Sequence, residues 1–145
     1  MSRLRIYLTG VGGQGTLTAT TLLARIALDK GMEVTSGEIH GMAQRGGVVE
    51  STILLGGWQS PKISFGEADV MLGFEPLETL RGLPYLRQGG SVVSSTDFLP
   101  PVAVSMGQDQ LPDLENIQEK VSAWAGDSLF LPSRALGLEA GAVQS

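Results

Sequence analysis

The fold of this chain is decided near its amino terminus by residues 4–16, which read LRIYLTGVGGQGT. Apolar residues alternate in the first half of this stretch, with Leu4, Ile6 and Leu8 on one face. Tyr7 lies on the opposite face, so that both faces of the segment carry large side chains. This pattern predicts an inner β-strand of a layered α/β domain.

An amphipathic helix is predicted directly after the glycines. Apolar residues recur at helical spacing at Leu22, Leu23, Ile26 and Ala27. A lysine in the last turn and Gly31 just after it are typical of a helix end with a left-handed cap. The glycine-rich turn therefore joins a strand to a helix.

The turn fits the pattern G-x-G-x-x-G through Gly10, Gly12 and Gly15. We expect Gly10 to make the tight turn, Gly12 to admit a bound group, and Gly15 to let the helix lie close to the strand. The free amides of the first helical turn favour an anion, and phosphate is the usual one. The alternative is a turn that serves only close packing of helix against sheet.

A dinucleotide site requires more than this turn. An acidic residue that binds the ribose is expected about 20 residues on, at the end of the second strand. Here Glu33 begins the second predicted strand, residues 33–36, and Glu38 is expected in the loop beyond it. The turn alone therefore does not predict NAD or FAD binding.

Composition excludes several classes of protein. A length of 145 residues indicates one domain with one core, and a net charge of −5 argues against nucleic-acid binding. No apolar run approaches the roughly 20 residues that cross a bilayer, and no signal-like stretch opens the chain, so we expect a cytoplasmic protein without membrane contact. The chain has no cysteine and one histidine, which excludes disulfides, thiolate-bound iron–sulfur clusters and a histidine-rich zinc site. We therefore predict no metal site.

Strands and helices alternate along the rest of the chain. This alternation predicts a three-layer, Rossmann-like α/β fold, a mostly parallel sheet with helices on both faces. The expected segments are strands at 33–36, 48–55, 68–74, 90–95, 102–105 and 128–131, and helices that begin at Pro76 and after Asp113.

Three segments are expected at the carboxyl ends of strands, where ligands of such sheets bind: Gly10–Thr16, Ser36–Arg45 and Gly73–Pro76. We predict that they converge on one site.

Three side chains in or near these segments are candidates for function. His40 titrates near neutral pH, and its alternative role is that of a loop residue bonded to backbone. Arg45 has the planar fork that grips phosphate or carboxylate, and its alternative is an ion pair with Glu38 or Glu50. Glu75, before Pro76, is expected to cap a helix and to face the same cleft.

Three blocks of sequence together resemble the gamma-type subunit or domain of 2-oxoacid (pyruvate/ketoisovalerate):ferredoxin oxidoreductases, with the indolepyruvate branch most similar. The blocks are GVGGQG at 10–15, EIHGMAQRGG at 38–47 and EADVMLGFEPLE at 67–78. The resemblance covers residues 4–100 and weakens after Asp97. Members of this family continue beyond the point that matches Ser145, so we expect the single domain, residues 1–145, to be truncated at its carboxyl end.

The resemblance implies an oxidative decarboxylation in which a 2-oxoacid and coenzyme A give an acyl-coenzyme A and carbon dioxide, with electrons passed to ferredoxin. Thiamine diphosphate and the iron–sulfur clusters belong to partner chains, ferredoxin is reached indirectly through them, and this chain is inactive alone. Coenzyme A is the co-substrate that this chain is expected to contact. The residues carried over for that contact are Gly10, Gly12, Gly13, Gln14, Gly15, Thr16, His40, Arg45 and Glu75, with His40 and Arg45 as candidates for a catalytic role.

Two other functions compete with this one. A freestanding NAD- or FAD-binding module would bind a dinucleotide without a partner enzyme. A pure assembly scaffold would tolerate changes in the turn and at Arg45 without loss of activity.

Overall fold

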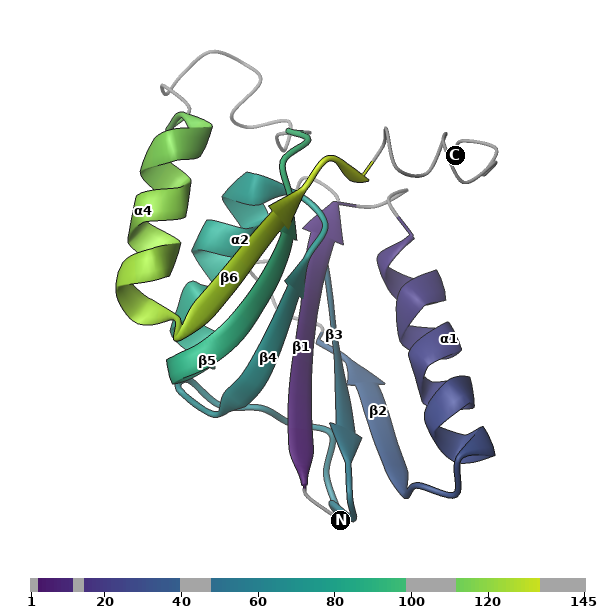
Figure 1. Cartoon of the computed structure of the whole chain (residues 1–145). Helices are drawn as coiled ribbons and strands as arrows, with labels where there is room; N and C mark the ends of the chain where they lie inside the picture. Colours follow the sequence, from purple (N-terminus) through teal and green to yellow (C-terminus); the bar gives the residue numbers. More distant parts are fainter. Residues whose placement is uncertain (1–2, 12–14, 40–47, 99–111, 134–145) are drawn as a thin grey trace.

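The computed structural model describes residues 3–11, 15–39, 48–98 and 112–133. This part of the chain forms one six-stranded sheet with helices on both faces, as the sequence predicts (Figure 1). In chain order the elements are β1 Leu4–Val11, α1 Thr16–Asp29, β2 Val34–Glu38, β3 Val48–Leu55, β4 Ala68–Gly73, α2 Pro76–Gly82, the 3-10 turn η1 Leu83–Tyr85, β5 Leu86–Ser95, α4 Leu114–Trp124 and β6 Asp127–Leu131.

The sheet has the strand order β2-β3-β1-β4-β5-β6 and is mostly parallel. The exception is β3, which pairs antiparallel with β1 on one side and β2 on the other. Only residues 39–47 separate β2 from β3, and a parallel connection needs a dozen or more residues. The chain therefore returns antiparallel between two strands that run the same way.

Each face of the sheet is covered by different helices. Helix α1 packs mainly on β3 and also contacts β1 and β2, whereas on the opposite face α2 packs on β1, β4 and β5, and α4 packs on β5 and β6 (Figure 1). The core on the α1 side is built from Ile6, Leu8, Ala27, Ile53 and Leu55. The core on the other side contains Tyr7, Leu54, Ile63, Ala68, Met71, Leu86, Val92, Ile117 and Val121. The predicted alternation of Ile6 and Leu8 against Tyr7 is confirmed.

The change of face occurs between β1 and β4, and we call the place between the carboxyl ends of these strands the β1–β4 crevice. The chain leaves β1 toward α1 on one face and leaves β4 toward α2 on the other, which is the topological switch point of an open α/β sheet. The two strand ends lie side by side, because the backbone N–H of Phe74 donates to the carbonyl of Thr9 at 2.8 Å. Ligands of such folds bind outside these strand ends.

Several local expectations are corrected by the structure. Glu38 is the last residue of β2 and not part of a loop. On α1 the apolar stripe is only partly used, because Ala27 is buried while Leu22 and Ile26 are 56% and 43% exposed. The apolar stripe of Leu114, Ile117, Val121 and Trp124 predicts that all four side chains of α4 lie in the core. Trp124 is instead 38% exposed, and its indole N–H donates to the carbonyl of Leu86 at 2.7 Å. The predicted strand at 102–105 lies outside the described residues.

Among the residues that the structure describes, no helix is long and apolar enough to cross a membrane.

Candidate functional site at the β1–β4 crevice

Two of the three predicted site segments meet at the crevice, and the described part of the third reaches the same end of the sheet. Thr9 pairs with Gly73 of β4 on one side and with Glu50 of β3 on the other. The backbone N–H of Ile39, just beyond β2, donates to the carbonyl of Glu50 at 3.0 Å. The predicted convergence is therefore supported for the described residues, whereas His40 and Arg45 lie outside them.

Two glycines of the turn have structural roles that differ from those predicted by the motif. Gly10 does not turn the chain, since it lies within β1 opposite Val49. Gly15 is the N-cap of α1 with φ +84°, and a Cβ added there would meet nothing within 4 Å. Its requirement is therefore a left-handed backbone and not close packing of helix and strand. Gly12, Gly13 and Gln14 lie outside the described residues, so their roles stay predictions.

The close approach expected of the glycine turn occurs instead at the end of β4. A Cβ on Gly73 would lie 1.8 Å from the hydroxyl oxygen of Thr79 in α2. That hydroxyl donates a hydrogen bond to the carbonyl of Glu75 at 3.1 Å. A second hydrogen bond, 2.7 Å long, joins it to the hydroxyl of Ser94. Glycine at 73 thus lets α2 begin directly against the sheet.

The start of α1 has the features of an anion site. Gly15 offers no side chain to cap the helix, and the first turn contains no acidic residue. The first amides of any helix lack intrahelical partners and carry the positive end of the helix dipole. Thr16, the first helical residue, is only 3% exposed, and its hydroxyl has no hydrogen-bond partner within the described structure. A buried hydroxyl without a partner beside free amides favours a bound oxyanion.

The start of α2 is capped from within the chain. Glu75 is fully buried and its carboxylate accepts a hydrogen bond from the backbone N–H of Glu78 at 2.8 Å. Pro76 occupies the first turn, as its missing N–H allows. The predicted capping role of Glu75 is confirmed, and its contact with a cofactor stays a prediction.

Carboxylates that are buried or half-buried make the α2 side of the crevice unsuitable for an anion. Glu50 accepts a hydrogen bond from the hydroxyl of Tyr7, and Glu78 is paired with Arg81 at 3.1 Å. Burial raises the pKa of Glu78, the Arg81 guanidinium opposes this rise, and the charges of Glu75 and Glu50 add to it. Burial also raises the pKa of Tyr7, as does its bond to Glu50. An anion is therefore favoured at α1 and disfavoured at α2.

Three further residues lie at this site without having been predicted there from the sequence: Glu50, Glu78 and Tyr7. One signal was available for Glu50, because it is the single charged residue of β3, and a charged side chain within a sheet needs a partner. Within the described residues, no group of His, Asp and Glu side chains fits a metal ion.

Comparisons with known proteins place this arrangement in a family. Residues 5–142 match the family described as pyruvate ferredoxin/flavodoxin oxidoreductase. The chain is 44% identical to the indolepyruvate oxidoreductase subunit IorB of Pyrococcus horikoshii, over 99% of this chain and 72% of that protein. It is 42% identical to the subunit of the same name from Thermococcus kodakarensis, over 97% of this chain and 71% of that protein.

Solved structures share the fold at low sequence identity. The gamma subunit of a keto/oxoacid ferredoxin oxidoreductase from Geobacter sulfurreducens superposes with a TM-score of 0.62 at 18% identity, covering 96% of this chain and 68% of that one. A 2-oxoglutarate:ferredoxin oxidoreductase from Magnetococcus marinus, solved with 2-oxoglutarate, coenzyme A and succinyl-CoA bound, gives 0.60 at 17% identity, covering 98% of this chain and 22% of that one. On the strength of the family match and the identity to its relatives, the chain belongs to the pyruvate ferredoxin/flavodoxin oxidoreductase family.

Proposed function

We propose that this chain is the gamma-type subunit of a 2-oxoacid:ferredoxin oxidoreductase and that it binds a phosphate group of coenzyme A at the start of α1. The observation that carries this proposal is the buried, unpartnered hydroxyl of Thr16 at an uncapped helix start. This helix start lies at the switch point of the sheet, where ligands of α/β folds bind. The residues present there fit a phosphate, since they combine hydrogen-bond donors with the positive end of a helix.

The reaction proposed for the assembled enzyme is the oxidative decarboxylation of a 2-oxoacid. The 2-oxoacid and coenzyme A give acyl-coenzyme A and carbon dioxide, and the electrons go to ferredoxin. Thiamine diphosphate, bound by a partner chain, would supply the stabilisation of the carbanion. This chain has no cysteine to hold an iron–sulfur cluster, so the clusters also belong to a partner. Its own task is to bind and orient coenzyme A.

The relatives favour an arylpyruvate as the 2-oxoacid. The two relatives that are 44% and 42% identical to this chain are both named as indolepyruvate oxidoreductase subunits. We therefore propose indolepyruvate, or a related arylpyruvate, as the substrate of the assembly. A cytoplasmic location is part of the same proposal.

The dinucleotide-binding alternative draws support from one observation. Glu38 lies at the end of β2, where a ribose-binding acid is expected in Rossmann folds. However, β3 intervenes between β2 and β1, so Glu38 lies two strand spacings from β1, about 9.6 Å, and not one. Glu38 therefore lies at the correct end of its strand, but that strand is not the neighbour of β1. Saturable NAD or FAD binding by the purified chain alone would favour this alternative.

The test of coenzyme A binding uses the enzyme reconstituted with its partner. Thr16→Val removes the hydroxyl with little change in shape, and we expect the KM for coenzyme A to rise about tenfold or more, because a hydrogen bond to a charged group contributes about 1.5–3 kcal/mol. The conservative variant Thr16→Ser should restore a value near that of the wild type. Thr18→Val, an exposed change on the same helix, is the matched control and should leave the KM unchanged.

Arg45→Ala is tested in the same assay, because Arg45 is the predicted anion-binding residue between β2 and β3. We expect weaker saturation by coenzyme A or slower turnover, with the exposed Lys62→Ala as its control. Normal kinetics would remove Arg45 from the site. An unchanged KM for coenzyme A in Thr16→Val, in a variant that unfolds at the wild-type temperature, would overturn the phosphate site.

A further inference from the structure

Three hydroxyl side chains are buried together where the first turns of α1 meet the sheet. Thr16 and Thr20 lie one turn apart on α1 and are 3% and 8% exposed, and Ser51 of β3 is fully buried. Ile53 and Leu55, further along the same strand, belong to the core beneath α1, and alternation places Ser51 on their face. The contact between α1 and β3 therefore changes from apolar to polar toward the helix start.

The protons of two of these hydroxyls can be assigned from their hydrogen bonds. Thr20 Oγ1 donates to the carbonyl oxygen of Thr16 at 2.8 Å, and it lies 2.6 Å from Ser51 Oγ. A hydroxyl has one proton, so Thr20 cannot also donate to Ser51, and Ser51 is the donor in that second bond. The two bonds therefore form a chain that runs from Ser51 through Thr20 to the Thr16 carbonyl.

The third hydroxyl is left without a use inside the protein. Thr16 Oγ1 is buried and has no hydrogen-bond partner within the described structure. The protons of Ser51 and Thr20 are both engaged in the chain of bonds. The Thr16 hydroxyl is therefore the one of the three that can donate to a ligand.

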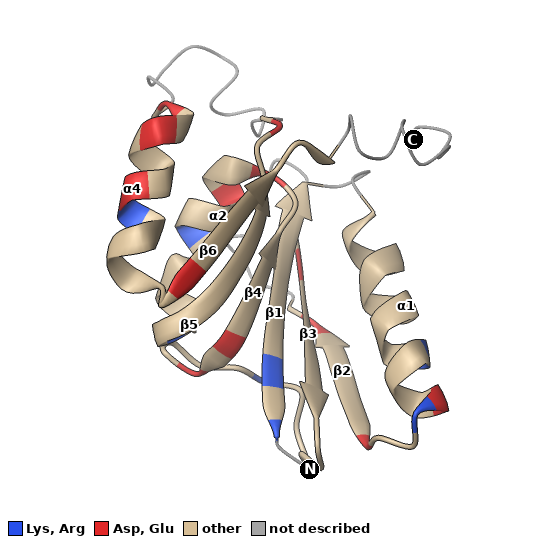
Figure 2. Ribbon diagram, viewed as in Figure 1, with Lys and Arg blue, Asp and Glu red and all other residues tan. Residues whose placement is uncertain are grey.

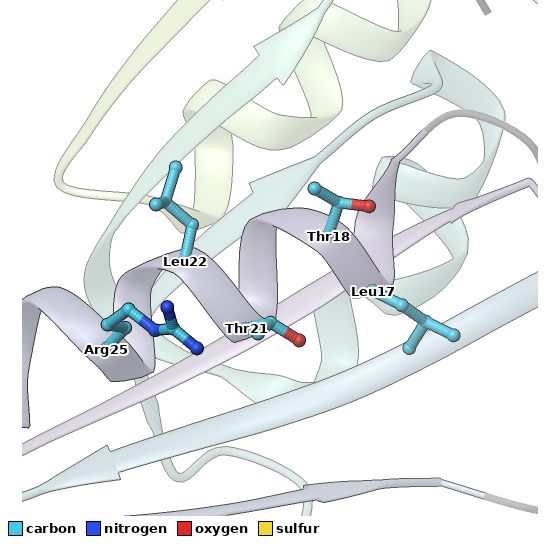
Figure 3. A pocket seen from close by; sticks show the side chains of 5 residues that line it. All are labelled: Leu17, Thr18, Thr21, Leu22 and Arg25. Atoms are coloured by element: carbon cyan, nitrogen blue, oxygen red, sulfur yellow. The ribbon is translucent and has the colours of Figure 1, made fainter.

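Packing alone does not require the hydroxyls of Thr20 and Ser51. An apolar pair of similar size would fill the same space and leave no buried polar group to satisfy, and such replacements are often neutral or stabilising. The other two threonines of α1, Thr18 and Thr21, are exposed and line a hollow on the outer surface of the helix together with Leu17, Leu22 and Arg25 (Figure 3). The buried pair thus points to a role at the helix start.

One such role is to hold a helix start that has no side-chain cap. Gly15 cannot bond the first amides through a side chain, and helix ends fray. The first backbone bond of α1 runs from the N–H of Ala19 to the carbonyl of Gly15 at 2.8 Å. The bond from Thr20 to the Thr16 carbonyl adds a restraint on the first turn, and Ser51 ties this restraint to β3. The position of the first turn is thereby fixed relative to the sheet.

The same chain of bonds strengthens a donor at the helix start. The peptide group whose carbonyl oxygen belongs to Thr16 carries the N–H of Leu17, one of the first amides of α1, which lack an intrahelical partner. Hydrogen bonds in a chain polarise one another, so a proton donated to this carbonyl makes the N–H a stronger donor. Figure 2 shows no charged side chain in the first turns of α1, so no carboxylate of this helix competes with an anion there.

We propose that Thr20 and Ser51 are positioning residues for the coenzyme A phosphate at the start of α1. They act behind the site, because they fix the first turn and strengthen the Leu17 amide, whereas Thr16 supplies its hydroxyl to the phosphate. This role rests on the proposed function, since it is defined by the phosphate bound there. A site that is fixed before its ligand arrives binds more tightly, because less ordering accompanies binding.

The test measures steady-state kinetics of the enzyme reconstituted with its partner. Thr20→Val removes both bonds with little change in shape, and we expect the KM for coenzyme A to rise about three- to fivefold, less than in Thr16→Val, because Thr20 acts through other groups. Ser51→Ala removes only the outer bond, and we expect a rise of about twofold. The KM for the 2-oxoacid and the kcat at saturating coenzyme A should be unchanged in both variants. Thr20→Ser keeps the hydroxyl and should restore the wild-type KM.

The matched control is Thr52→Val, at the next position of β3. Thr52 is 1% exposed, and its hydroxyl donates to the carbonyl of Pro61 at 2.6 Å. Alternation places it on the face of the sheet opposite to Ser51. This variant loses the same kind of buried bond to a backbone carbonyl, and its stability should fall by a similar amount. Its KM for coenzyme A should stay at the wild-type value, which separates positioning of the phosphate from a general loss of stability.

The results for Thr16 and Thr20 distinguish this role from the phosphate site itself. A raised KM for coenzyme A in Thr16→Val, with a wild-type KM in both Thr20→Val and Ser51→Ala, would overturn the positioning role and leave the phosphate site standing. A wild-type KM in Thr16→Val would overturn both. An equal rise in Thr20→Val and Thr52→Val would also overturn the positioning role, since loss of any buried hydroxyl would then have the same effect.

Discussion

Two glycines near the crevice show how one residue type meets two different physical demands. Gly15 needs a left-handed backbone at the start of α1 and has open space where a Cβ would lie. Gly73 has no such backbone demand, since its φ is not positive, but a Cβ there would collide with Thr79. Glycine is required at 15 by the local backbone conformation, and at 73 by the close packing of α2 against β4.

This difference predicts the order of two substitutions. Gly15→Ala should destabilise the fold by about 1–2 kcal/mol, the cost of a left-handed alanine. Gly73→Ala should cost more than about 3 kcal/mol, because the methyl group overpacks a tight contact and displaces the buried Thr79 hydroxyl from Glu75 and Ser94. Urea unfolding of both variants measures the difference. A Gly73→Ala variant as stable as Gly15→Ala would show that the contact with Thr79 is not tight.

Helix α2 is short, and its first turn combines a cap with a buried charge. Glu75 caps the helix, and Glu78 lies in the first turn at 2% exposure beside Arg81. Burial raises the pKa of Glu78 above its usual value of 4.5, although Arg81 opposes the shift. The folded chain therefore keeps this proton to a higher pH than the unfolded chain does.

The pH dependence of stability follows with a definite sign. The contribution of Glu78 is complete below the unfolded pKa of 4.5 and is lost as the pH rises through the folded value. Glu78→Gln cannot ionise, so its stability relative to the wild type should increase from about pH 4 to about pH 7. Urea unfolding across this range tests the trend, with the exposed Glu119→Gln on α4 as control. A relative stability that falls with pH would mean that the Arg81 pair outweighs burial.

Local patterns were enough to predict most elements. Alternation identified β1, and Gly31, which has φ +81°, ended α1 where expected. Asp113 caps α4 through the N–H of Asn116 at 2.8 Å, as predicted. The place of β3 between β2 and β1 was missed, because strand order depends on which segments pair and not on the pattern within either segment.

At the scale of the whole molecule, the position of the site could be predicted but not its full composition. The switch point follows from strands that alternate with helices, and Gly10, Thr16 and Glu75 lie around it. Glu50, Glu78 and Tyr7 could not be assigned, since their meeting depends on strand order and on the register of β1 with β3. The burial of Thr16 likewise emerges only from the packed structure.

The whole molecule is best understood as one part of a divided enzyme. It has an uncapped helix start, to which we propose a phosphate binds, and no cysteine with which to hold a cluster. Binding of one co-substrate is thereby separated from the redox chemistry, which belongs to other chains under our proposal.

The most direct test of this division measures reduction of a viologen dye by a 2-oxoacid in the presence of coenzyme A. We predict no turnover by this chain alone, and coenzyme A-dependent turnover when it is combined with the partner that holds thiamine diphosphate and the clusters. Turnover by the isolated chain, or equal turnover by the partner without it, would contradict the account.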